Sequence, residues 1–308
     1  MNRRHAMAIL GAVAFTSCSR RDPLLTFSAI AFGTEVHFQT HGISAPAFDQ
    51  ISTEVSNRLR EIELLFSLYD SNSAIRRLNR DGKLDNPPPE FLKLVRIALD
   101  SGEKTGGLFD ITVQPLWDWR QAWKAADNAG RTAMQADSWN TTVALVDYRK
   151  VSAYAERISL EKAGMAITLN GIAQGYATDE VVALLKKHGI RNALVNIGEY
   201  AALGTAPDGK PWSVKIAATG ETLALPSGRA LAVSAGSGHI FDPDGRFHHL
   251  FRPSDGANIR PRSTIIVTAP TATVADALST ALSVANDAQR REILANFSAT
   301  DYREIHGD

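Results

Sequence analysis

Two oxygen-bearing side chains, Asp276 and Thr280, stand four positions apart in an apolar stretch near the C-terminal end of the chain. Residues 272–284 (ATVADALSTALSV) have helical spacing, so both side chains are predicted to project from one helix face about one turn apart. A carboxylate and a hydroxyl are hard oxygen ligands, which suit Mg²⁺ better than zinc. The alternative is that Asp276 caps a turn and Thr280 bonds to the backbone.

The stretch Ala166 to Asp179, AITLNGIAQGYATD, offers a second candidate site. Alternation around Thr168 predicts a strand, and the pattern beyond Gly171 predicts a helix that ends near His188. Free backbone N–H groups after a glycine at such a junction are a common phosphate site. A plain packing turn is the alternative, because the G-x-x-x-G spacing is neither the dinucleotide fingerprint nor a Walker motif.

A third cluster, HIFDPDGRFHH over residues 239–249, is the most metal-like by composition. Its Asp-Pro-Asp-Gly core is turn chemistry between two extended arms. His248 and His249 should point to opposite sides of one arm, so a shared zinc ion is not expected. One of them would face a site and the other would face water. No G-x-S-x-G elbow is present, so serine hydrolase chemistry has no support.

Composition excludes some function classes. The 308 residues carry 33 basic and 33 acidic side chains, a formal charge of +0 that gives no support for nucleic-acid binding. Three tryptophans between residues 117 and 123 could stack on bases. Without a surrounding excess of lysine and arginine, packing is the favoured interpretation.

The first residues have the character of an export signal. Arg3 and Arg4 precede an apolar run over residues 6–15 that is too short to span a bilayer, which predicts a twin-arginine-like signal over residues 1–22. Cys18, the only cysteine, rules out an intramolecular disulfide and allows either lipidation or an ordinary cleavage site. We therefore expect a periplasmic protein whose only membrane contact would be an N-terminal lipid anchor.

Residues 23–308 are expected to form one α+β domain, with mixed or antiparallel sheets and packed helices, in one or two lobes. No repeat or linker suggests a further boundary. Apolar spacing predicts helices over residues 49–66, 90–104 and 272–284, and one or two helical turns over 73–79. Strands are predicted within residues 25–38, 147–163, 192–197, 212–217, 229–234 and 264–268.

Several segments, taken in order, resemble the bacterial ApbE-type FAD:protein FMN transferases. They are FGT at residues 32–34, FSLY at 66–69, TGGLFDITV at 105–113, the stretch 166–179, NALVNIGE at 192–199, the His249 segment, and ADALSTAL at 275–282. Together they span nearly all of the chain after the signal. The forms NGIAQGYATD and ADALSTAL are most similar to the branch associated with nitrous oxide reductase maturation, which is NosX-like.

This resemblance implies an ApbE-like fold and a specific activity. Such enzymes bind FAD and Mg²⁺ in the cell envelope, transfer the FMN part to a threonine hydroxyl of a partner flavoprotein domain, and release AMP. The acceptor could be a membrane electron-transfer protein. The alternatives are a flavin-binding carrier without transfer activity and an FAD pyrophosphatase that uses water as acceptor.

The resemblance also implies roles for particular residues. The metal would be held by Asp276, Thr280 and the backbone of Gly171, with Ser279 beside them. Flavin contacts would come from Phe32, Tyr69, Leu108, Phe109, Asp110, Thr168, Gln174 and Phe251. His249 is the candidate general base, because an imidazole with a near-neutral pKa can accept the threonine proton. Asp110 is the second candidate catalytic residue, and a hydrogen-bonded strand residue is the alternative for His249.

Four positions depart from the family's usual residues. Phe32 stands where methionine is frequent, Thr168 where aspartate is usual, and Gln174 where lysine is common. Arg252 stands where the family usually has an aspartate after a His-Ile-Ile-like run. Loss of the aspartate and the lysine removes opposite charges from one segment, so these two changes can compensate each other. Arg252 could contact a phosphate or alter acceptor positioning.

Overall fold

The computed structural model describes residues 23–127, 130, 131, 134, 136–258 and 263–306. The predicted export signal and Cys18 lie outside the described residues. The chain divides into two compact units. Unit 1 comprises Met1–Glu63, Ala173–Ala232 and Thr268–Asp276, and unit 2 comprises Leu64–Ile172, Val233–Val267 and Ala277–Asp308. None of the helices in the described part of the chain has both the length and the apolar character that crossing a membrane requires.

Unit 1 is built on antiparallel strands. The hairpin of β1 (Leu25–Ala31) and β2 (Thr34–Thr40) turns at Phe32 and Gly33. From β2 the antiparallel pairing continues in the order β6 (Ala193–Asn196), β7 (Tyr200–Leu203) and β10 (Ala230–Ala235). Val36 and Phe38 on β2 are completely buried, as expected for a central strand of a covered sheet.

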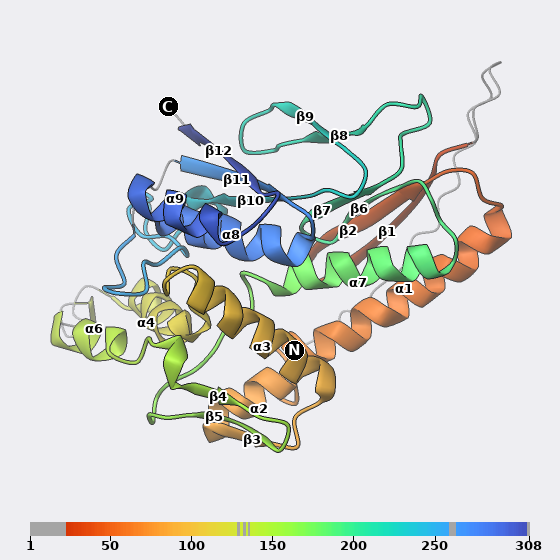
Figure 1. The fold of residues 1–308 in the computed structure, drawn as a ribbon. Coiled ribbons are helices and arrows are strands. Elements are labelled where there is room, and N and C mark those ends of the chain that lie inside the picture. Colours follow the sequence, from red (N-terminus) through yellow and green to blue (C-terminus); the bar gives the residue numbers. More distant parts are fainter. Residues whose placement is uncertain (1–22, 128–129, 132–133, 135, 259–262, 307–308) are drawn as a thin grey trace. The chain divides into compact units, whose positions relative to one another are not determined.

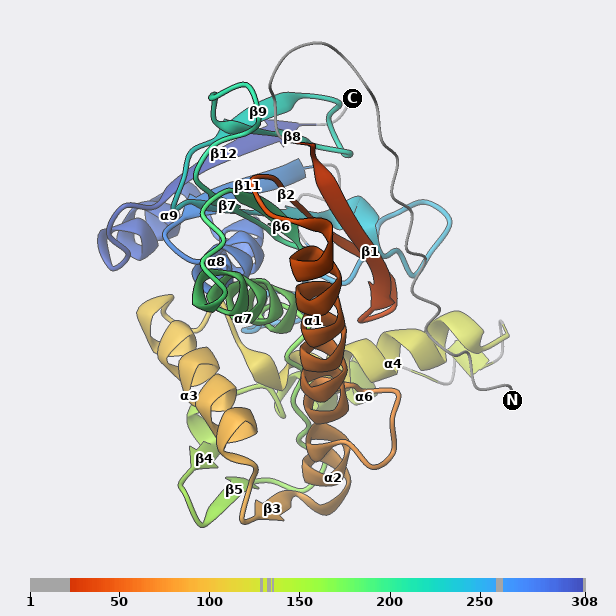
Figure 2. The same cartoon turned by 90° about the vertical axis from the view of Figure 1, so that its right-hand side faces the viewer.

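Two long helices cover one face of these strands (Figures 1 and 2). They are α1 (Ala45–Phe66) and α7 (Ala173–Lys187), and the β8 (Trp212–Lys215) and β9 (Thr222–Leu225) hairpin lies on the other side of the strands. The predicted apolar stripe of α1 is confirmed, because Val55, Leu59 and Ile62 are buried. The helix begins four residues before its predicted start.

Unit 2 contains a small antiparallel sheet with helices beside it (Figure 2). Its strand order is β3 (Lys83–Asp85), β5 (Arg157–Leu160), β4 (Val151–Ala153). The other elements that lie wholly in unit 2 are α2 (Ala74–Asp81), α3 (Pro89–Lys104), η1 (Ile111–Val113), α4 (Gln114–Ala125), α6 (Ala136–Val143), η2 (Tyr148–Lys150), η3 (Gly236–Gly238), α9 (Asp287–Ala295) and β12 (Asp301–His306).

Local sequence signals explain where the early helices of unit 2 start and stop. The Ser73 side chain accepts a hydrogen bond from Arg76 N at the start of α2, and Gly82 ends it with a φ of 67°. Proline occupies the first position of α3, where the missing N–H costs no hydrogen bond. The predicted helices over residues 73–79 and 90–104 are thereby confirmed.

The strands β10 and β11 (Ser263–Ala269) and the helix α8 (Ala272–Val284) each run from one unit to the other. The strand order of the largest sheet is β1-β2-β6-β7-β10-β11-β12. Helix α8 has the predicted bounds, and Asp276 is the last residue that it contributes to unit 1.

The strand predicted before Gly171 is wrong. Within the described part of the chain, residues 166–169 belong to no strand. The Asn79 side chain bonds to both backbone groups of Ile167, at 2.7 and 2.8 Å, and Thr168 N donates to Ile111 O at 2.7 Å. The backbone of this segment is therefore hydrogen-bonded to a side chain and to a loop instead of to a neighbouring strand. Alternating burial along the segment occurs without strand pairing.

The tryptophan-rich segment is used for packing, as predicted. The Trp119 ring meets the Trp139 ring edge-on at 4.8 Å between centroids, and Trp117 meets Phe241 edge-on at 5.1 Å. The Arg120 guanidinium lies 4.4 Å from the Trp139 ring centroid, in cation–π geometry. Burial lowers the pKa of Arg120 to about 10, so the guanidinium stays charged at neutral pH.

Candidate active site

Asp276 is held inside unit 1 by the start of α7. Its side chain is buried, and the carboxylate Oδ2 accepts a hydrogen bond from Gly175 N at 2.9 Å. A Cβ on Gly175 would lie 2.3 Å from the Ala272 carbonyl oxygen and 2.8 Å from the Asp276 Cβ. The close approach of α7 and α8 therefore requires glycine at position 175.

A second carboxylate on α7 caps the same end of α8. Asp179 accepts hydrogen bonds from Ala272 N at 2.8 Å, from Thr273 N at 2.9 Å and from Thr273 Oγ1 at 2.5 Å. These backbone groups are among the N–H donors that a helix leaves unsatisfied at its start. Asp179 therefore fixes the N-terminus of the helix that carries Asp276.

The surroundings of Asp276 make the negative charge of its carboxylate unfavourable. Burial raises the pKa of Asp276 to about 7, with a further contribution from the charge of Asp179. A cation beside this carboxylate would offset the cost of keeping its charge away from water. Carboxylate, hydroxyl and carbonyl oxygens are the donors that Mg²⁺ prefers. Within the described ranges no group of three or more histidine, cysteine, aspartate or glutamate side chains has metal-binding geometry, so such a site would rest on one carboxylate and neutral oxygens.

Three residues distant in sequence come together in unit 2. A Cβ placed on Gly171 would lie 3.0 Å from Thr280 Oγ1 and 3.3 Å from Phe109 Cε2. The Ser279 hydroxyl is 2.7 Å from the Ser234 hydroxyl, so Ser279 is buried against the end of β10. The predicted proximity of Gly171 and Thr280 is thus observed, and Phe109 lies beside them.

Asp110 is fully engaged by its own chain. Its Oδ1 accepts hydrogen bonds from Thr112 N at 2.7 Å and Thr112 Oγ1 at 2.6 Å, and its Oδ2 accepts one from Tyr148 N at 2.9 Å. Thr112 Oγ1 accepts in turn from Asp147 N at 2.8 Å. Burial raises the pKa of the Asp110 carboxyl. This geometry describes a residue that holds the turn before η1, and its catalytic role stays a prediction.

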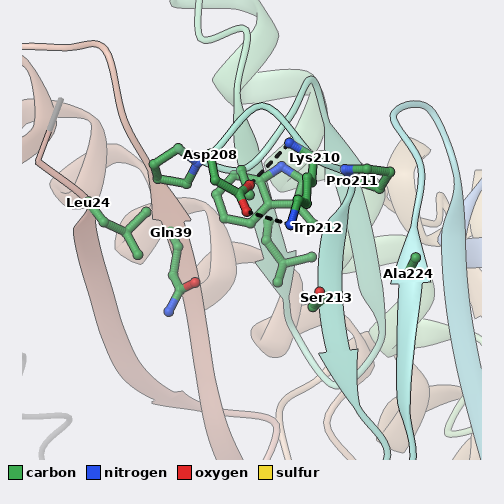
Figure 3. A pocket seen from close by; sticks show the side chains of 11 residues that line it. Leu24, Gln39, Asp208, Lys210, Pro211, Trp212, Ser213 and Ala224 are labelled. Atoms are coloured by element: carbon green, nitrogen blue, oxygen red, sulfur yellow. Dashed lines mark hydrogen bonds and ion pairs between the residues drawn. The ribbon is translucent and has the colours of Figure 1, made fainter. Parts of the chain in front are cut away.

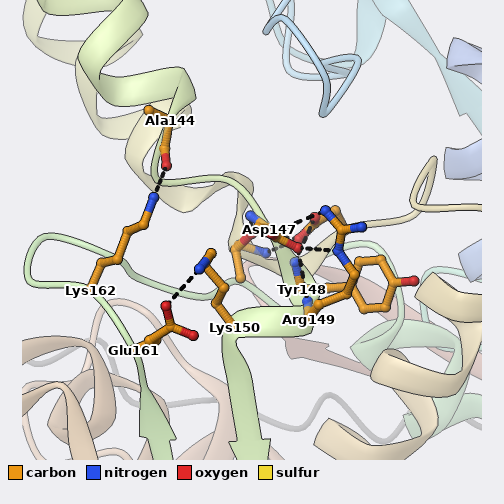
Figure 4. A network of polar contacts seen from close by, with 9 residues as sticks. Ala144, Asp147, Tyr148, Arg149, Lys150, Glu161 and Lys162 are labelled. Carbon is orange, nitrogen blue, oxygen red and sulfur yellow. Dashed lines mark hydrogen bonds and ion pairs between the residues drawn. The ribbon is translucent and has the colours of Figure 1, made fainter.

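The segment around η2 completes this polar network (Figure 4). The Asp147 carboxylate pairs with Arg149, and Lys150 pairs with Glu161 at 2.6 Å. The Tyr148 ring lies against Gly102 in the last turn of α3 and Gly107 in the turn that follows, where a Cβ would lie 3.0 Å from Tyr148 Cδ2 and 3.5 Å from Tyr148 Cε1, respectively. The turn that carries Leu108, Phe109 and Asp110 is thereby fixed from two sides.

His249 and His248 lie in a short antiparallel bridge. Ile240 pairs with His248, and the Asp242 carboxylate accepts from Phe247 N at 2.7 Å, which confirms the predicted turn. The expectation that one of the two histidines faces water is wrong, because His248 is completely buried and His249 is mostly buried. Alternation along an extended arm therefore does not predict the burial of these two rings.

The His249 imidazole is oriented for proton acceptance. Its Nδ1 is 3.3 Å from the His239 carbonyl oxygen, which can only accept, so Nδ1 carries the proton and Nε2 keeps its lone pair. Burial lowers the pKa of His249 to about 4. The near-neutral pKa expected from the sequence is therefore corrected: the imidazole is neutral at physiological pH and is a weak base in the free protein.

The chain matches the model of the ApbE family over residues 32–302. This protein belongs to the ApbE family. The FAD:protein FMN transferase of Haemophilus influenzae is 26% identical, in an alignment covering 98% of this chain and 92% of that protein. The enzyme of the same name from Salmonella typhimurium is 27% identical over 95% of this chain and 91% of its own. The prediction that the chain belongs to a family of transferases is thus confirmed.

Solved ApbE structures share the fold. The apo form of the Pseudomonas stutzeri flavinyl transferase ApbE superposes with a TM-score of 0.75 at 22% identity, covering 94% of this chain and 97% of that one. The ApbE protein of Thermotoga maritima also gives 0.75, at 26% identity, over 88% of this chain and 90% of its own. The predicted α+β class with antiparallel sheets is confirmed.

Of the flavin contacts that the ApbE resemblance implies, those in unit 2 have diverse environments. Tyr69 is 95% exposed, whereas Leu108 and Phe109 are buried and Thr168 is half-buried. Phe251 is buried in a cluster with Leu116 and Phe241, and its flavin contact stays a prediction.

In unit 1, the two residues implied as flavin contacts are both half-buried. The Phe32 backbone N–H donates to Glu63 Oε1 at 3.1 Å. The Gln174 side chain lies against the backbone of Gly198. A Cβ added to Gly198 would lie 2.5 Å from Gln174 Cδ. Glycine at position 198, with a φ of 96°, therefore makes room for Gln174.

A surface pocket of about 590 Å³ in unit 1 contains none of the predicted site residues (Figure 3). Asp208 and Lys210, which pair at 3.8 Å, lie next to each other in its lining. The Trp212 indole donates to Leu203 O at 2.9 Å and is fixed by that bond. The pocket brings together no group of side chains suited to phosphoryl transfer.

Sequence reasoning missed the residues that orient the site. Asp179 and Gly175 lie in the stretch Ala166 to Asp179, which the sequence singled out. Their contacts with α8, however, join positions about a hundred residues apart. One sequence feature could have indicated the role of Glu63. It is an acidic residue in the last turn of a helix, where the helix dipole disfavours negative charge.

Proposed function

We propose that this protein is a Mg²⁺-dependent FAD:protein FMN transferase, which attaches FMN from FAD to a threonine hydroxyl of a partner flavoprotein and releases AMP. The match to the ApbE family over residues 32–302 is the observation that carries the proposal. The buried Asp276, fixed by Gly175 and Asp179, supports it because a cation beside this carboxylate would offset the cost of burying its charge.

Asp276 and Thr280, with the backbone of Gly171, are proposed to hold the metal, and Ser279 to support them. A bound Mg²⁺ would neutralise negative charge on the FAD pyrophosphate. Asp179 and Gly175 keep Asp276 in place, so the ligand need not reorganise when the metal binds. The flavin contacts proposed are Phe32, Tyr69, Leu108, Phe109, Asp110, Thr168, Gln174 and Phe251.

His249 is proposed to accept the proton of the acceptor threonine. The threonine oxygen forms a bond to the FMN phosphorus, the bond from this phosphorus to the AMP oxygen breaks, and the threonine proton moves to His249 Nε2. Because burial lowers the pKa of His249 to about 4, the imidazolium is disfavoured in the free protein. The phosphate charges of bound FAD would favour it, and the proton can then leave with AMP.

The transfer assay tests this proposal. Purified mature protein is given FAD, Mg²⁺ and a partner flavin domain, and covalent flavin should remain on the partner after denaturing electrophoresis. AMP release without a partner would indicate FAD hydrolysis, and FAD binding without AMP release would indicate a carrier. Either result, together with no covalent flavin on the partner, overturns the transferase proposal.

The metal assignment has its own test. Asp276→Ala should abolish Mg²⁺-dependent transfer and calorimetric Mg²⁺ binding, with an unchanged circular dichroism spectrum. Asp100→Ala is the matched control, because Asp100 is an exposed carboxylate on α3 that pairs with Lys104. Mg²⁺ binding retained by the Asp276 variant would refute the role.

We also propose that the protein is exported, with residues 1–22 as the signal and residues 23–308 as the transferase domain in the periplasm. Arg3, Arg4 and the apolar run after them support this. The similarity to the nitrous oxide reductase maturation branch suggests a redox partner in the envelope. Cell fractionation of the full chain and of an Arg3→Lys, Arg4→Lys variant should show periplasmic protein only for the former.

A further inference from the structure

The turn between β1 and β2 holds a phenylalanine in a backbone conformation that side chains avoid. Ala31 pairs with Thr34, so the loop consists of Phe32 and Gly33 alone. Both have positive φ, 52° and 75°, as a type I′ turn requires. Asparagine, aspartate and glycine suit the first of these positions, and a bulky aromatic residue is strained there.

This strain is not explained by packing in the core. The Phe32 side chain is only half-buried, while Ile30, two residues earlier, is 59% exposed. A hairpin with asparagine at position 32 would keep the same register without the strain. Strained residues that persist in folded proteins are concentrated at functional sites.

A carboxylate from α1 fixes this turn. Glu63 Oε1 accepts the hydrogen bond from Phe32 N at 3.1 Å. Glu63 stands in the last turn of α1, which contains no basic residue, so its charge lies at the unfavourable end of the helix dipole. The backbone conformation is thus unfavourable for Phe32, and the helix position is unfavourable for the charge of Glu63. A hydrogen bond joins these two residues.

We propose that Glu63 is a positioning residue that fixes the Phe32 turn so that the Phe32 ring is presented to the isoalloxazine part of FAD. This inference rests on the proposed function, which supplies FAD as the ligand. It adds Glu63 as the residue that orients the Phe32 contact. It assigns the contact to the flavin end of the dinucleotide and not to the adenosine end. Local stability is sacrificed at both residues for this contact.

Calorimetric titration of the mature protein with FAD and, separately, with ADP tests the inference. Phe32→Asn should weaken FAD binding about tenfold, the effect of losing one stacked aromatic contact, and leave ADP affinity within about twofold. The same variant should melt about 1–3 °C higher, because the strain is relieved. A merely structural role would weaken both ligands and lower the melting temperature.

Glu63 variants test the positioning role. Glu63→Ala should weaken FAD binding severalfold without lowering the melting temperature, and Glu63→Gln, which keeps an acceptor oxygen, should restore the affinity. Glu61→Ala is the matched control, because Glu61 is an exposed carboxylate on the same helix that pairs with Arg58. Unchanged FAD affinity in Phe32→Asn or in Glu63→Ala would overturn the inference.

Binding and transfer are read separately, so the two proposals fail in different ways. A protein that binds FAD with the expected variant pattern but transfers nothing overturns the transferase proposal and supports this inference. A protein that transfers FMN while its FAD affinity is unaffected by the Phe32 substitution does the reverse. Absence of FAD binding by the unaltered protein overturns both.

Discussion

The Asp179 carboxylate accepts two hydrogen bonds from Thr273, one from the backbone N–H and one from the hydroxyl. This contact joins the middle of α7 to the first turn of α8, three residues before Asp276. The orientation of the proposed metal ligand therefore depends on a residue that touches no ligand itself.

Asp179→Ala should destabilise the protein by about 1–2 kcal/mol, the usual cost of losing an N-cap. Urea unfolding followed by circular dichroism measures this loss. Asp49→Ala, at an exposed position of α1 in the same unit, should change the free energy of unfolding by less than about 0.5 kcal/mol. Equal stability of the Asp179 variant and the parent would show that the α8 cap is dispensable.

Gly175→Ala should be harmful although alanine favours helices. The added methyl group would meet the Ala272 carbonyl oxygen at 2.3 Å, so α7 and α8 must separate, at a cost of about 1–3 kcal/mol. We expect lower thermal stability and weaker Mg²⁺ binding together. Ala183→Ser, at an exposed position of α7, is the control. A variant with parental Mg²⁺ affinity would contradict the close packing.

Asp110→Asn distinguishes a catalytic carboxylate from a structural one. The amide can still accept from Thr112, but its NH₂ group would face Tyr148 N, which leaves a buried donor unsatisfied at a cost of about 1–3 kcal/mol. We expect reduced stability in chemical denaturation, with transfer activity reduced in proportion to the folded fraction. Complete loss of transfer with unchanged stability would instead establish catalysis by Asp110.

His249 should make stability depend on pH. Its folded-state pKa of about 4 lies below the ordinary value of 6.5, so the unfolded chain binds more protons between these values. Stability from this group is complete above about pH 6.5 and is lost as pH falls towards 4, by at most about 3 kcal/mol. Melting temperatures between pH 4 and 8 should therefore vary less in His249→Gln than in the parent. His306→Gln, at an exposed position of β12, should keep the parental dependence.

The sequence predicted α8 well because its information is local. The spacing of Asp276 and Thr280 and the apolar pattern between them are sufficient to define the helix and its polar face. The residues that orient it could not be found in this way. Asp179 reaches Thr273 across 94 positions, and nothing near Asp179 indicates that its partner is a helix start.

Two incorrect predictions, the strand around Thr168 and the near-neutral pKa of His249, also concern properties that distant residues determine. Alternation around Thr168 predicted a strand, but whether a strand pairs depends on distant partners, and here Asn79 and Ile111 supply the bonds. For His249, the sequence indicates a titratable base and contains no information about the burial that lowers its pKa. Local pattern therefore predicts an element such as α8 but not the environment of an individual side chain.

The packing around Arg120 gives the protein a built-in optical probe. Trp117, Trp119, Trp123 and Trp139 all belong to unit 2, and Trp212, buried beside Leu203, belongs to unit 1. Replacing Trp212 with phenylalanine would confine the tryptophan emission, excited selectively over tyrosine, to unit 2. The melting of unit 2 could then be followed separately from that of the unit that holds Asp276, without any added label.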